Sequence, residues 1–125
     1  MLVFAIILLF ASPLLRAEPL SSSSRNELNA LLNKLVASGC EFNRNGSWYT
    51  GAEARGHLQR KLEYLEDKKA VQSTEQFIDL AASTSSYTGR AYLVRCGSGT
   101  AVESRKWLMT ELNAVRLASA GRAGK

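Results

Sequence analysis

The strongest structural signal in the chain is the stretch Cys40-Glu41-Phe42-Asn43-Arg44-Asn45-Gly46-Ser47-Trp48-Tyr49-Thr50. Asn-Gly between two strand-like runs is typical of a two-residue hairpin, because both central residues of a type I′ turn need a positive φ. Such a turn predicts the facing pairs Arg44–Ser47, Asn43–Trp48 and Phe42–Tyr49. Alternation along the strands then separates two faces, with Trp48 and Asn43 on one and, on the other, Cys40, Phe42, Arg44, Ser47 and Tyr49.

An amphipathic helix is predicted before this hairpin. Ser24 can cap it, and Glu27 three residues later completes a capping box. Gly39 is the type of residue that commonly follows the end of a helix. Apolar residues recur at the helical spacing i, i+3, i+4, i+7 and i+8 and predict one buried stripe of Leu28, Leu31, Leu32, Leu35 and Val36.

Three further helices are predicted after the hairpin. Thr50 and Glu53 form a second capping box, so the next helix is expected to run from about Gly51 to Lys69. A third covers roughly Thr74–Ala82 and a fourth roughly Val102–Leu117. Their inward residues are expected to be Ala54, Leu58, Leu62 and Leu65, then Phe77, Ile78 and Ala81, then Trp107, Leu108, Leu112 and Val115.

The N-terminus carries an unbroken apolar run, Leu2–Ala11. Ten or so apolar residues are too few to cross a hydrocarbon core about 30 Å thick. The run fits the apolar region of a signal peptide, with Ala17 as the small residue before the cleavage point. We therefore expect residues 1–17 to be removed on export, leaving a mature form without a transmembrane segment. A short membrane anchor or a buried N-terminal helix is the alternative.

These patterns predict an α+β fold. The run Ala91-Tyr92-Leu93-Val94-Arg95-Cys96 is rich in strand formers. About four helices are expected to pack on a small antiparallel sheet made of the hairpin and this one further strand. A chain of 125 residues suits one domain. The expected organisation is a signal peptide at 1–17, a flexible lead-in at 18–23, a single domain at 24–117 and a flexible tail at 118–125.

The chain contains two cysteines, Cys40 and Cys96. In an exported protein they predict one disulfide, because the extracytoplasmic compartment favours oxidation. The alternative is a redox pair or half of a metal site. The sequence contains no Cys-x-x-Cys motif and only one histidine, which argues against both of these roles. We therefore expect neither a bound metal nor another cofactor.

The charge is mildly basic, with 16 Lys and Arg against 11 Asp and Glu and a formal net charge of +5. Basic pairs such as Lys68-Lys69 are interrupted by acidic residues, whereas a nucleic-acid interface usually shows a clustered stripe. No nucleic-acid partner is therefore expected. Attraction to anionic components of the cell envelope fits this charge, and a solvated face of mixed charge is the simpler alternative.

Several of these motifs together resemble the YfeK-like family, a group of small exported proteins of Gram-negative bacteria with a domain of unknown function. The matching residues span about 27–117 and include Cys40-x-Phe42-x-Arg44-Asn45-Gly46-Ser47-Trp48, Glu53-Ala54-Arg55-x-His57-Leu58-x-x-Lys61, Phe77-Ile78, Ala82-Ser83, Ser85-Ser86, Thr88-Gly89 and Tyr92-x-Val94-x-Cys96. The resemblance implies a periplasmic protein and an intact single domain. It implies no particular reaction.

The single histidine, His57, is the main candidate for chemistry. Glu53, His57 and Lys61 follow one another at i, i+4 and i+8, along one flank of the second predicted helix. A carboxylate beside an imidazole can orient a general base. Glu53 is also expected to cap the helix, and a lone histidine beside an apolar stripe is more often structural. His57 and Glu53 are therefore only candidate catalytic residues.

A binding surface is predicted where the hairpin end, the start of the second helix and the loop 83–89 could meet. Arg44 could clamp a carboxylate or phosphate, although a structural residue at the hairpin end or a salt bridge with an acidic neighbour is the simpler explanation. Arg44, Trp48, His57 and Tyr87 are residue types that recur at recognition hot spots. These residues favour a non-enzymatic module that binds an envelope protein, glycan or anionic ligand. The alternative is a small envelope hydrolase or transferase that uses His57 and Glu53.

Overall fold

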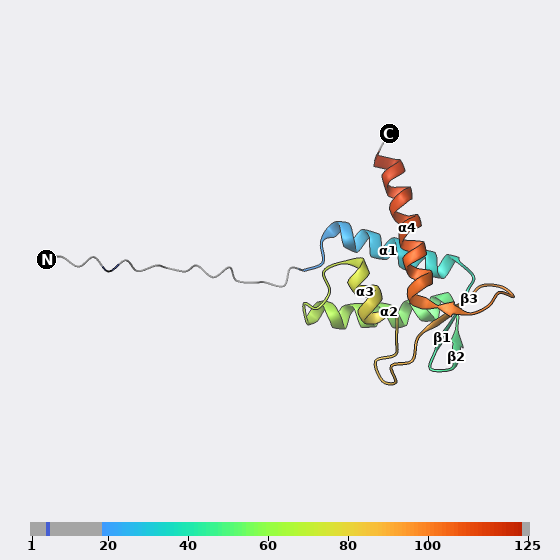
Figure 1. Ribbon diagram of the computed structural model, residues 1–125. Coiled ribbons are helices and arrows are strands. Elements are labelled where there is room, and N and C mark those ends of the chain that lie inside the picture. The colour runs from blue at the N-terminus through green and yellow to red at the C-terminus, as the bar shows by residue number, and fades with distance from the viewer. Residues whose placement is uncertain (1–4, 6–18, 124–125) are drawn as a thin grey trace.

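The computed structural model describes Ala5 and residues 19–123, so most of the predicted signal peptide and residues 124–125 lie outside the described residues. Figure 1 shows the course of the chain. In chain order its elements are α1 (Ser22–Ala37), β1 (Glu41–Arg44), β2 (Ser47–Tyr49), α2 (Gly51–Asp67), α3 (Thr74–Ala81), β3 (Leu93–Arg95), β4 (Val102–Glu103) and α4 (Ser104–Ala123).

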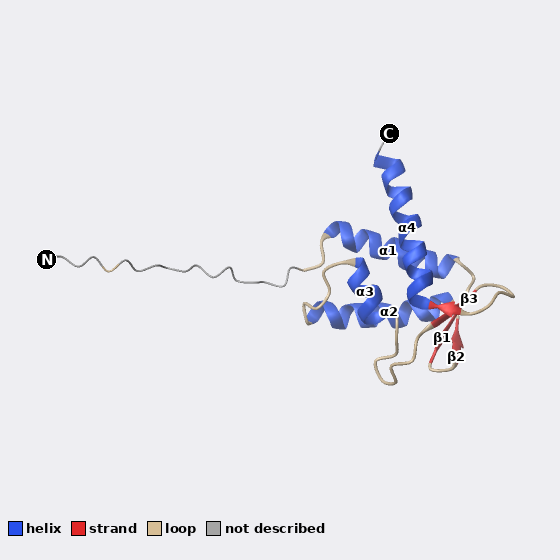
Figure 2. Ribbon diagram, in the orientation of Figure 1, coloured by secondary structure: helices blue, strands red, loops and turns tan. Residues whose placement is uncertain are grey.

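The α+β prediction is confirmed. The strands form one antiparallel sheet in the order β2-β1-β3-β4, and Figure 2 shows them gathered at one side of the helices. The predicted sheet lacked β4, because Val102 and Glu103 were assigned to the start of the fourth helix. Val102 instead pairs with Val94, and Glu103 pairs with Leu93. This two-residue strand depends on its neighbour β3, which a local pattern does not reveal.

The hairpin has the predicted register, with Phe42 opposite Tyr49 and Arg44 opposite Ser47. Asn45 and Gly46 adopt φ angles of 52° and 88°, as the type I′ turn requires. The predicted disulfide is also present. Cys40 and Cys96 lie just before β1 and just after β3 and are bonded at 2.02 Å, which ties the two neighbouring strands together at one end.

The ends of the first and last helices differ from the prediction. The N-cap of α1 is Ser21, whose hydroxyl accepts a hydrogen bond from the Ser24 amide, so the helix begins earlier than the expected cap at Ser24. Leu20 is buried in the core, and the end of the expected flexible lead-in therefore belongs to the domain. At the other end, α4 continues to Ala123 rather than ending at Leu117, because the following residues are rich in alanine, the best helix former.

The core lies where α1 packs against the other helices and the inner face of the sheet. Leu28, Leu31, Leu32 and Leu35 of α1 are each at most 1% exposed, and each such side chain contributes about 1.5–3 kcal/mol of burial free energy. Val36 was expected in the same stripe, yet it is 41% exposed because it lies at the margin of that stripe. Phe42 brings the sheet into this core and meets Trp107 of α4 edge to face.

The start of α2 packs closely against α1. Gly51 is buried, and a Cβ atom built on it would lie 2.5 Å from the Leu35 carbonyl oxygen and 3.0 Å from Val36 Cα. Only glycine fits there without a shift of the backbone. This contact, together with the cap at Thr50, fixes the direction in which α2 leaves the hairpin.

Candidate functional site

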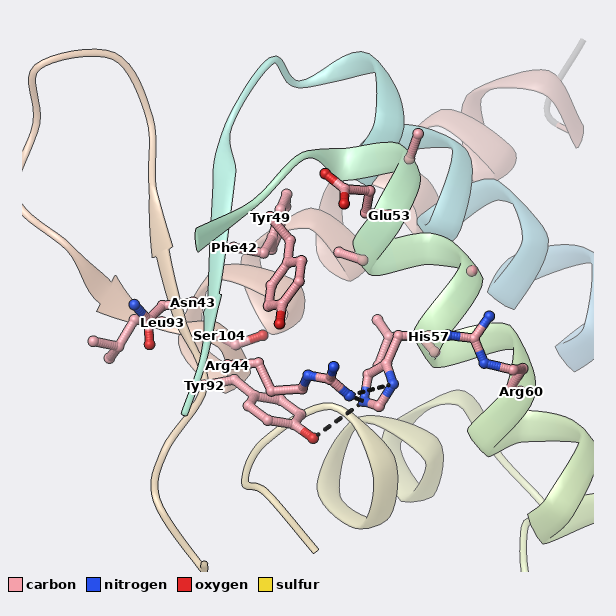
Figure 3. A pocket seen from close by; sticks show the side chains of 14 residues that line it. Phe42, Asn43, Arg44, Tyr49, Glu53, His57, Arg60, Tyr92, Leu93 and Ser104 are labelled. Carbon is pink, nitrogen blue, oxygen red and sulfur yellow. Dashed lines mark hydrogen bonds between the residues drawn. The ribbon is translucent and has the colours of Figure 1, made fainter. Parts of the chain in front are cut away.

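A pocket of about 350 Å³ lies between the hairpin and α2. Figure 3 shows Arg44, Tyr49, His57 and Tyr92 directed toward this space, while the side chains of Asn43 and Leu93 point away from it. Thr50 connects β2 directly to α2, so the first turns of α2 lie beside the inner face of the hairpin. The lining residues are Phe42, Asn43, Arg44, Tyr49, Ala52, Glu53, Ala54, Gly56, His57, Leu58, Arg60, Tyr92, Leu93 and Ser104.

Arg44 and His57 are in direct contact. The Arg44 Nη1 lies 2.9 Å from His57 Nδ1. A guanidinium can only donate, so Nδ1 accepts this hydrogen bond and the proton of the neutral imidazole belongs on Nε2. This tautomer follows from the hydrogen-bond network rather than from an observed proton. His57 Nε2 then donates to the Tyr92 hydroxyl oxygen at 3.3 Å (Figure 3).

The Tyr92 hydroxyl joins a second donor to this network. Lys61 Nζ donates to the same oxygen at 3.1 Å and lies 5.1 Å from the centre of the Tyr92 ring. Arg44 lies in a similar way over Tyr49, with its guanidinium carbon 5.2 Å from the ring centre. Tyr49 therefore holds Arg44 in the pocket, and Tyr92 holds Lys61 at the edge of the pocket, where Lys61 lines an adjoining hollow.

The local environment disfavours a charged His57. Burial lowers the pKa of His57 to about 4, and the positive charges of Arg44, Lys61 and Arg60 add to the effect. Burial and the charge of Arg44 likewise lower the pKa of Lys61. Burial raises the pKa of Tyr92, which outweighs the opposite influence of Arg44. At neutral pH the site thus contains a neutral imidazole among cations.

These cations have no acidic partner among the described residues. Salt bridges within 4.0 Å are formed there by Arg25, Lys34, Arg95, Arg105 and Arg116. Arg44, Arg60 and Lys61 form none. The simple alternative for Arg44, a salt bridge at the hairpin end, is therefore not observed within the part of the chain that the structure describes. Arg44 and Arg60 line the pocket and Lys61 reaches its edge through the Tyr92 hydroxyl, so the cations outnumber Glu53, the one carboxylate in the lining.

Glu53 lines the same pocket, but its carboxylate caps the start of α2. Its Oε1 accepts hydrogen bonds from the Thr50 amide and hydroxyl, each at 3.1 Å, and the Thr50 hydroxyl accepts one from the Glu53 amide. The predicted capping box is confirmed. No hydrogen bond connects Glu53 with His57 in the described structure, so the two residues do not form a carboxylate–imidazole pair.

The other two predicted binding residues lie apart from this pocket. Trp48 is on the outer face of the sheet, where the Arg95 guanidinium carbon stacks 4.0 Å from its ring centre. Tyr87 is 98% exposed in the loop between α3 and β3. This loop does reach the hairpin, because the Asn45 side chain donates to the Ser85 hydroxyl at 3.1 Å and accepts from the Thr88 hydroxyl at 2.7 Å.

Three residues of the site were not identified as binding residues from the sequence: Tyr49, Arg60 and Tyr92. Tyr49 could have been found, because the predicted register places it on the same face as Arg44. The helical spacing offered Lys61 as a neighbour of His57, and Arg60 lies at i+3. Nothing local connects Tyr92 with His57, since 35 positions separate them.

The described residues contain no group of three or more His, Cys, Asp or Glu side chains that could hold a metal ion. Over the same residues, no helix has the length and apolar character needed to cross a bilayer.

Comparisons with known proteins agree with the resemblance seen in the sequence. The chain is 41% identical over 66 residues to the "Uncharacterized protein YfeK" of Salmonella typhimurium, and the alignment covers 52% of this chain and 53% of the relative. The chain thus spans about half the length of the curated relative it matches. No solved structure matches it. The model of a family of unknown function, DUF5329, matches residues 22–116, and the chain therefore belongs to that family.

Proposed function

We propose that this protein is a non-enzymatic binding module of the bacterial periplasm, and that its pocket holds the anionic group of an envelope component. The observation that carries the proposal is the cluster of Arg44, Arg60 and Lys61, which has no carboxylate partner among the described residues. Arg44 and Lys61 are half-buried, whereas Arg60 is exposed. Half-buried cations without partners are costly, and an anionic ligand would offset that cost.

The geometry of Arg44 supports this role. Its Nη1 is engaged by His57, which holds the side chain in place and leaves other N–H groups of the guanidinium for a ligand. A guanidinium can bind a carboxylate or a phosphate with two parallel hydrogen bonds. The contact with His57 therefore preorganises a donor that would otherwise lose side-chain entropy on binding.

A hydrolase or transferase that uses His57 and Glu53 has less support. A general base needs a free lone pair within reach of a proton, whereas His57 Nδ1 already accepts from Arg44 and Nε2 carries the proton. Glu53 Oε1 accepts from Thr50 at the helix cap, and no hydrogen bond joins Glu53 to His57 in the described structure.

The periplasmic location is part of the proposal. It is supported by the apolar run Leu2–Ala11 that precedes Ala17, and by the disulfide between Cys40 and Cys96. Structural disulfides persist in oxidising compartments such as the periplasm and are rare in the cytosol.

The proposal is tested by the melting temperature of the purified protein in phosphate, sulfate, succinate and acetate at one ionic strength. A ligand at ten times its Kd stabilises the folded state by about 1.4 kcal/mol, which raises the Tm of a domain of this size by about 5 °C or more. We expect at least one anion to do so, and we expect Arg44→Gln to remove the effect.

Two control variants make this experiment specific. Arg122→Gln removes the same charge from the exposed end of α4, and Trp48→Ala changes the outer face of the sheet. Both should keep the anion-induced rise in Tm. The proposal fails if no anion raises the Tm, or if Arg122→Gln abolishes the rise as completely as Arg44→Gln does.

A further inference from the structure

We propose that the anionic group bound in this pocket is a phosphate monoester carried on a small organic body. This inference rests on the proposed function and specifies its ligand. It depends on three features of the pocket: the number of unpaired cations, the hydroxyl donors that stand beside them, and a volume much larger than a single anion needs.

The charge of the site matches a dianion better than a monoanion. Arg44 and Arg60 line the pocket, Lys61 reaches its edge through the Tyr92 hydroxyl, and Glu53 is the one carboxylate in the lining. Three positive charges against one negative charge leave an excess of two. A single carboxylate would neutralise one of these cations. A phosphate monoester carries roughly 1.5 to 2 negative charges at neutral pH and offers three strong acceptor oxygens, so it can engage several of them at once.

Two hydroxyl groups add neutral donors. The Tyr92 oxygen accepts from both Lys61 and His57, and its own proton is therefore left to be donated elsewhere. Tyr49 makes no side-chain hydrogen bond to any described residue, and Figure 3 shows its hydroxyl directed toward Arg44. Both hydroxyls come from the strand side, Tyr49 from β2 and Tyr92 from the position before β3, whereas Arg60 donates from α2. Donors on two sides of the pocket suit a tetrahedral group better than a planar carboxylate.

The volume indicates that the phosphate is attached to a larger molecule. At about 350 Å³, the pocket has room for many times the roughly 30 Å³ that one water occupies in the liquid. Apolar residues, among them Phe42, Ala54 and Leu58, form part of its wall. A second hollow of about 310 Å³ shares His57 and Arg60 with the first and reaches the exposed side chains of Tyr64 and Leu80. An organic body can fill this space, whereas inorganic phosphate cannot.

The main comparison in the test is between two sugar esters that share a shape and differ in charge. Isothermal titration with the purified full-length protein at pH 7.5 uses glucose 6-phosphate, glucose 6-sulfate, inorganic phosphate and succinate. Both esters carry a tetrahedral anion on the same sugar, but the sulfate has a single charge. We expect the phosphate ester to bind about tenfold more tightly than the sulfate ester, the difference that one additional charge-assisted hydrogen bond makes.

The pH profile gives a second readout. The second ionisation of a phosphate monoester has a pKa of about 6, so about nine-tenths of the ester is a monoanion at pH 5. If the monoanion binds about tenfold more weakly, as expected for the sulfate ester, the apparent affinity for the phosphate ester should fall about fivefold between pH 7.5 and 5. Affinity for the sulfate ester should stay nearly constant. His57, which faces Arg44, Arg60, Lys61 and Tyr92, has a pKa of about 4 and remains mostly neutral over this range.

Tyr49→Phe is the variant that best probes the site. The Tyr49 hydroxyl makes no side-chain hydrogen bond within the described structure, so removing it should leave folding intact. The substitution should weaken binding of the phosphate ester several-fold. Tyr87→Phe, in which an exposed hydroxyl outside the lining is lost, is the matched control and should bind like the original protein.

Phosphatidylcholine vesicles with and without phosphatidic acid distinguish the source of the ester. If the protein sediments only with the phosphatidic acid vesicles, and Tyr49→Phe weakens this binding, the ligand is a lipid headgroup. If the protein binds the soluble ester, the ligand is a soluble metabolite or glycan. Either outcome supports the inference. Equal binding of both glucose esters, or tighter binding of succinate, would overturn the phosphate assignment while leaving the anion-binding function in place. Failure of every anion, in titration and in melting experiments alike, would overturn both.

Discussion

Replacing His57 with asparagine should remove part of the pH dependence of stability. In the folded protein the pKa of His57 is lowered from 6.5 to about 4, first by burial and then by the charges of Arg44, Lys61 and Arg60. Between these two values the unfolded chain binds a proton that the folded protein excludes. Stability therefore rises with pH in this window, and it is lost as the pH falls from about 6.5 to about 4.

The size of the effect follows from the shift. One pKa unit corresponds to about 1.4 kcal/mol, so a shift from 6.5 to about 4 would be worth about 3 kcal/mol if the imidazole were enclosed. His57 is only half-buried, and solvent screening weakens interactions at such positions. We therefore expect about 1–2 kcal/mol of stability to disappear between pH 7 and pH 4.5 on account of this residue.

Urea unfolding of the original protein and of His57→Asn at pH 7, 5.5 and 4.5 measures this contribution. Asparagine keeps a side-chain oxygen that can accept from Arg44 but cannot titrate. Carboxylates such as Glu27, whose pKa is lowered chiefly by its hydrogen bond to Arg116, also lose stabilising interactions in acid, and they do so equally in both proteins. The difference between the two curves isolates the histidine.

Two results would refute the reasoning. Parallel stability curves for the two proteins would mean that His57 titrates alike in the folded and unfolded states. An NMR titration measures the folded-state pKa directly, because the chain has a single histidine and its ring protons report one pKa. A folded-state value near 6.5 would show that burial and the neighbouring cations do not act as the geometry indicates.

Three further outcomes are expected. Gly46→Val should lower the free energy of unfolding more than His57→Ala does, because φ at Gly46 is 88° and a β-branched residue there costs roughly 1–3 kcal/mol of strain; urea melts that rank the two variants in the opposite order would contradict the turn. Gly51→Ala should destabilise by about 1–3 kcal/mol, because its Cβ would lie 2.5 Å from the Leu35 carbonyl oxygen, and a melt unchanged from the original would show that α1 and α2 separate freely. The intact mass of the exported protein should match a chain that begins near Glu18, and the protein should take up no alkylating agent before reduction. Breaking the disulfide, which joins residues 56 positions apart, should cost about 4 kcal/mol of stability by the chain-entropy model. Two alkylated cysteines without reduction would contradict the disulfide.

The features that could be predicted from the sequence are those specified by neighbouring residues. Asn45-Gly46 sets the turn, Thr50 and Glu53 set the start of α2, and both are present as expected. The features that escaped prediction depend on distant partners. β4 exists because Val102 pairs with Val94 of β3. The early start of α1 is an exception with a local cause, because Ser21 caps the helix where Ser24 with Glu27 was expected to do so.

In the candidate site, too, some contacts follow from neighbouring residues and others depend on distant ones. Arg44 and His57 lie 13 positions apart and meet through local rules alone. The turn register puts Arg44 on the inner face, and the cap at Thr50 starts α2 without a linker. Their contact could have been derived from the hairpin and the helical spacing, although each residue was identified only as a separate candidate.

Tyr92 is placed in the pocket by the loop that leads to β3 rather than by the hairpin register or the helix cap. Asn45 connects that loop with the hairpin. The backbone of Asn45 forms the turn with a positive φ, while its side chain binds the Ser85 and Thr88 hydroxyls of the loop that leads to β3. Asparagine is among the few non-glycine residues that tolerate this conformation, and its amide is both donor and acceptor. Glycine at position 45 would keep the turn and lose the loop contact. Asn45, whose turn directs Arg44 toward His57, thus also anchors the loop preceding Tyr92, so the arginine and the phenol that flank His57 are both positioned by one hairpin tip.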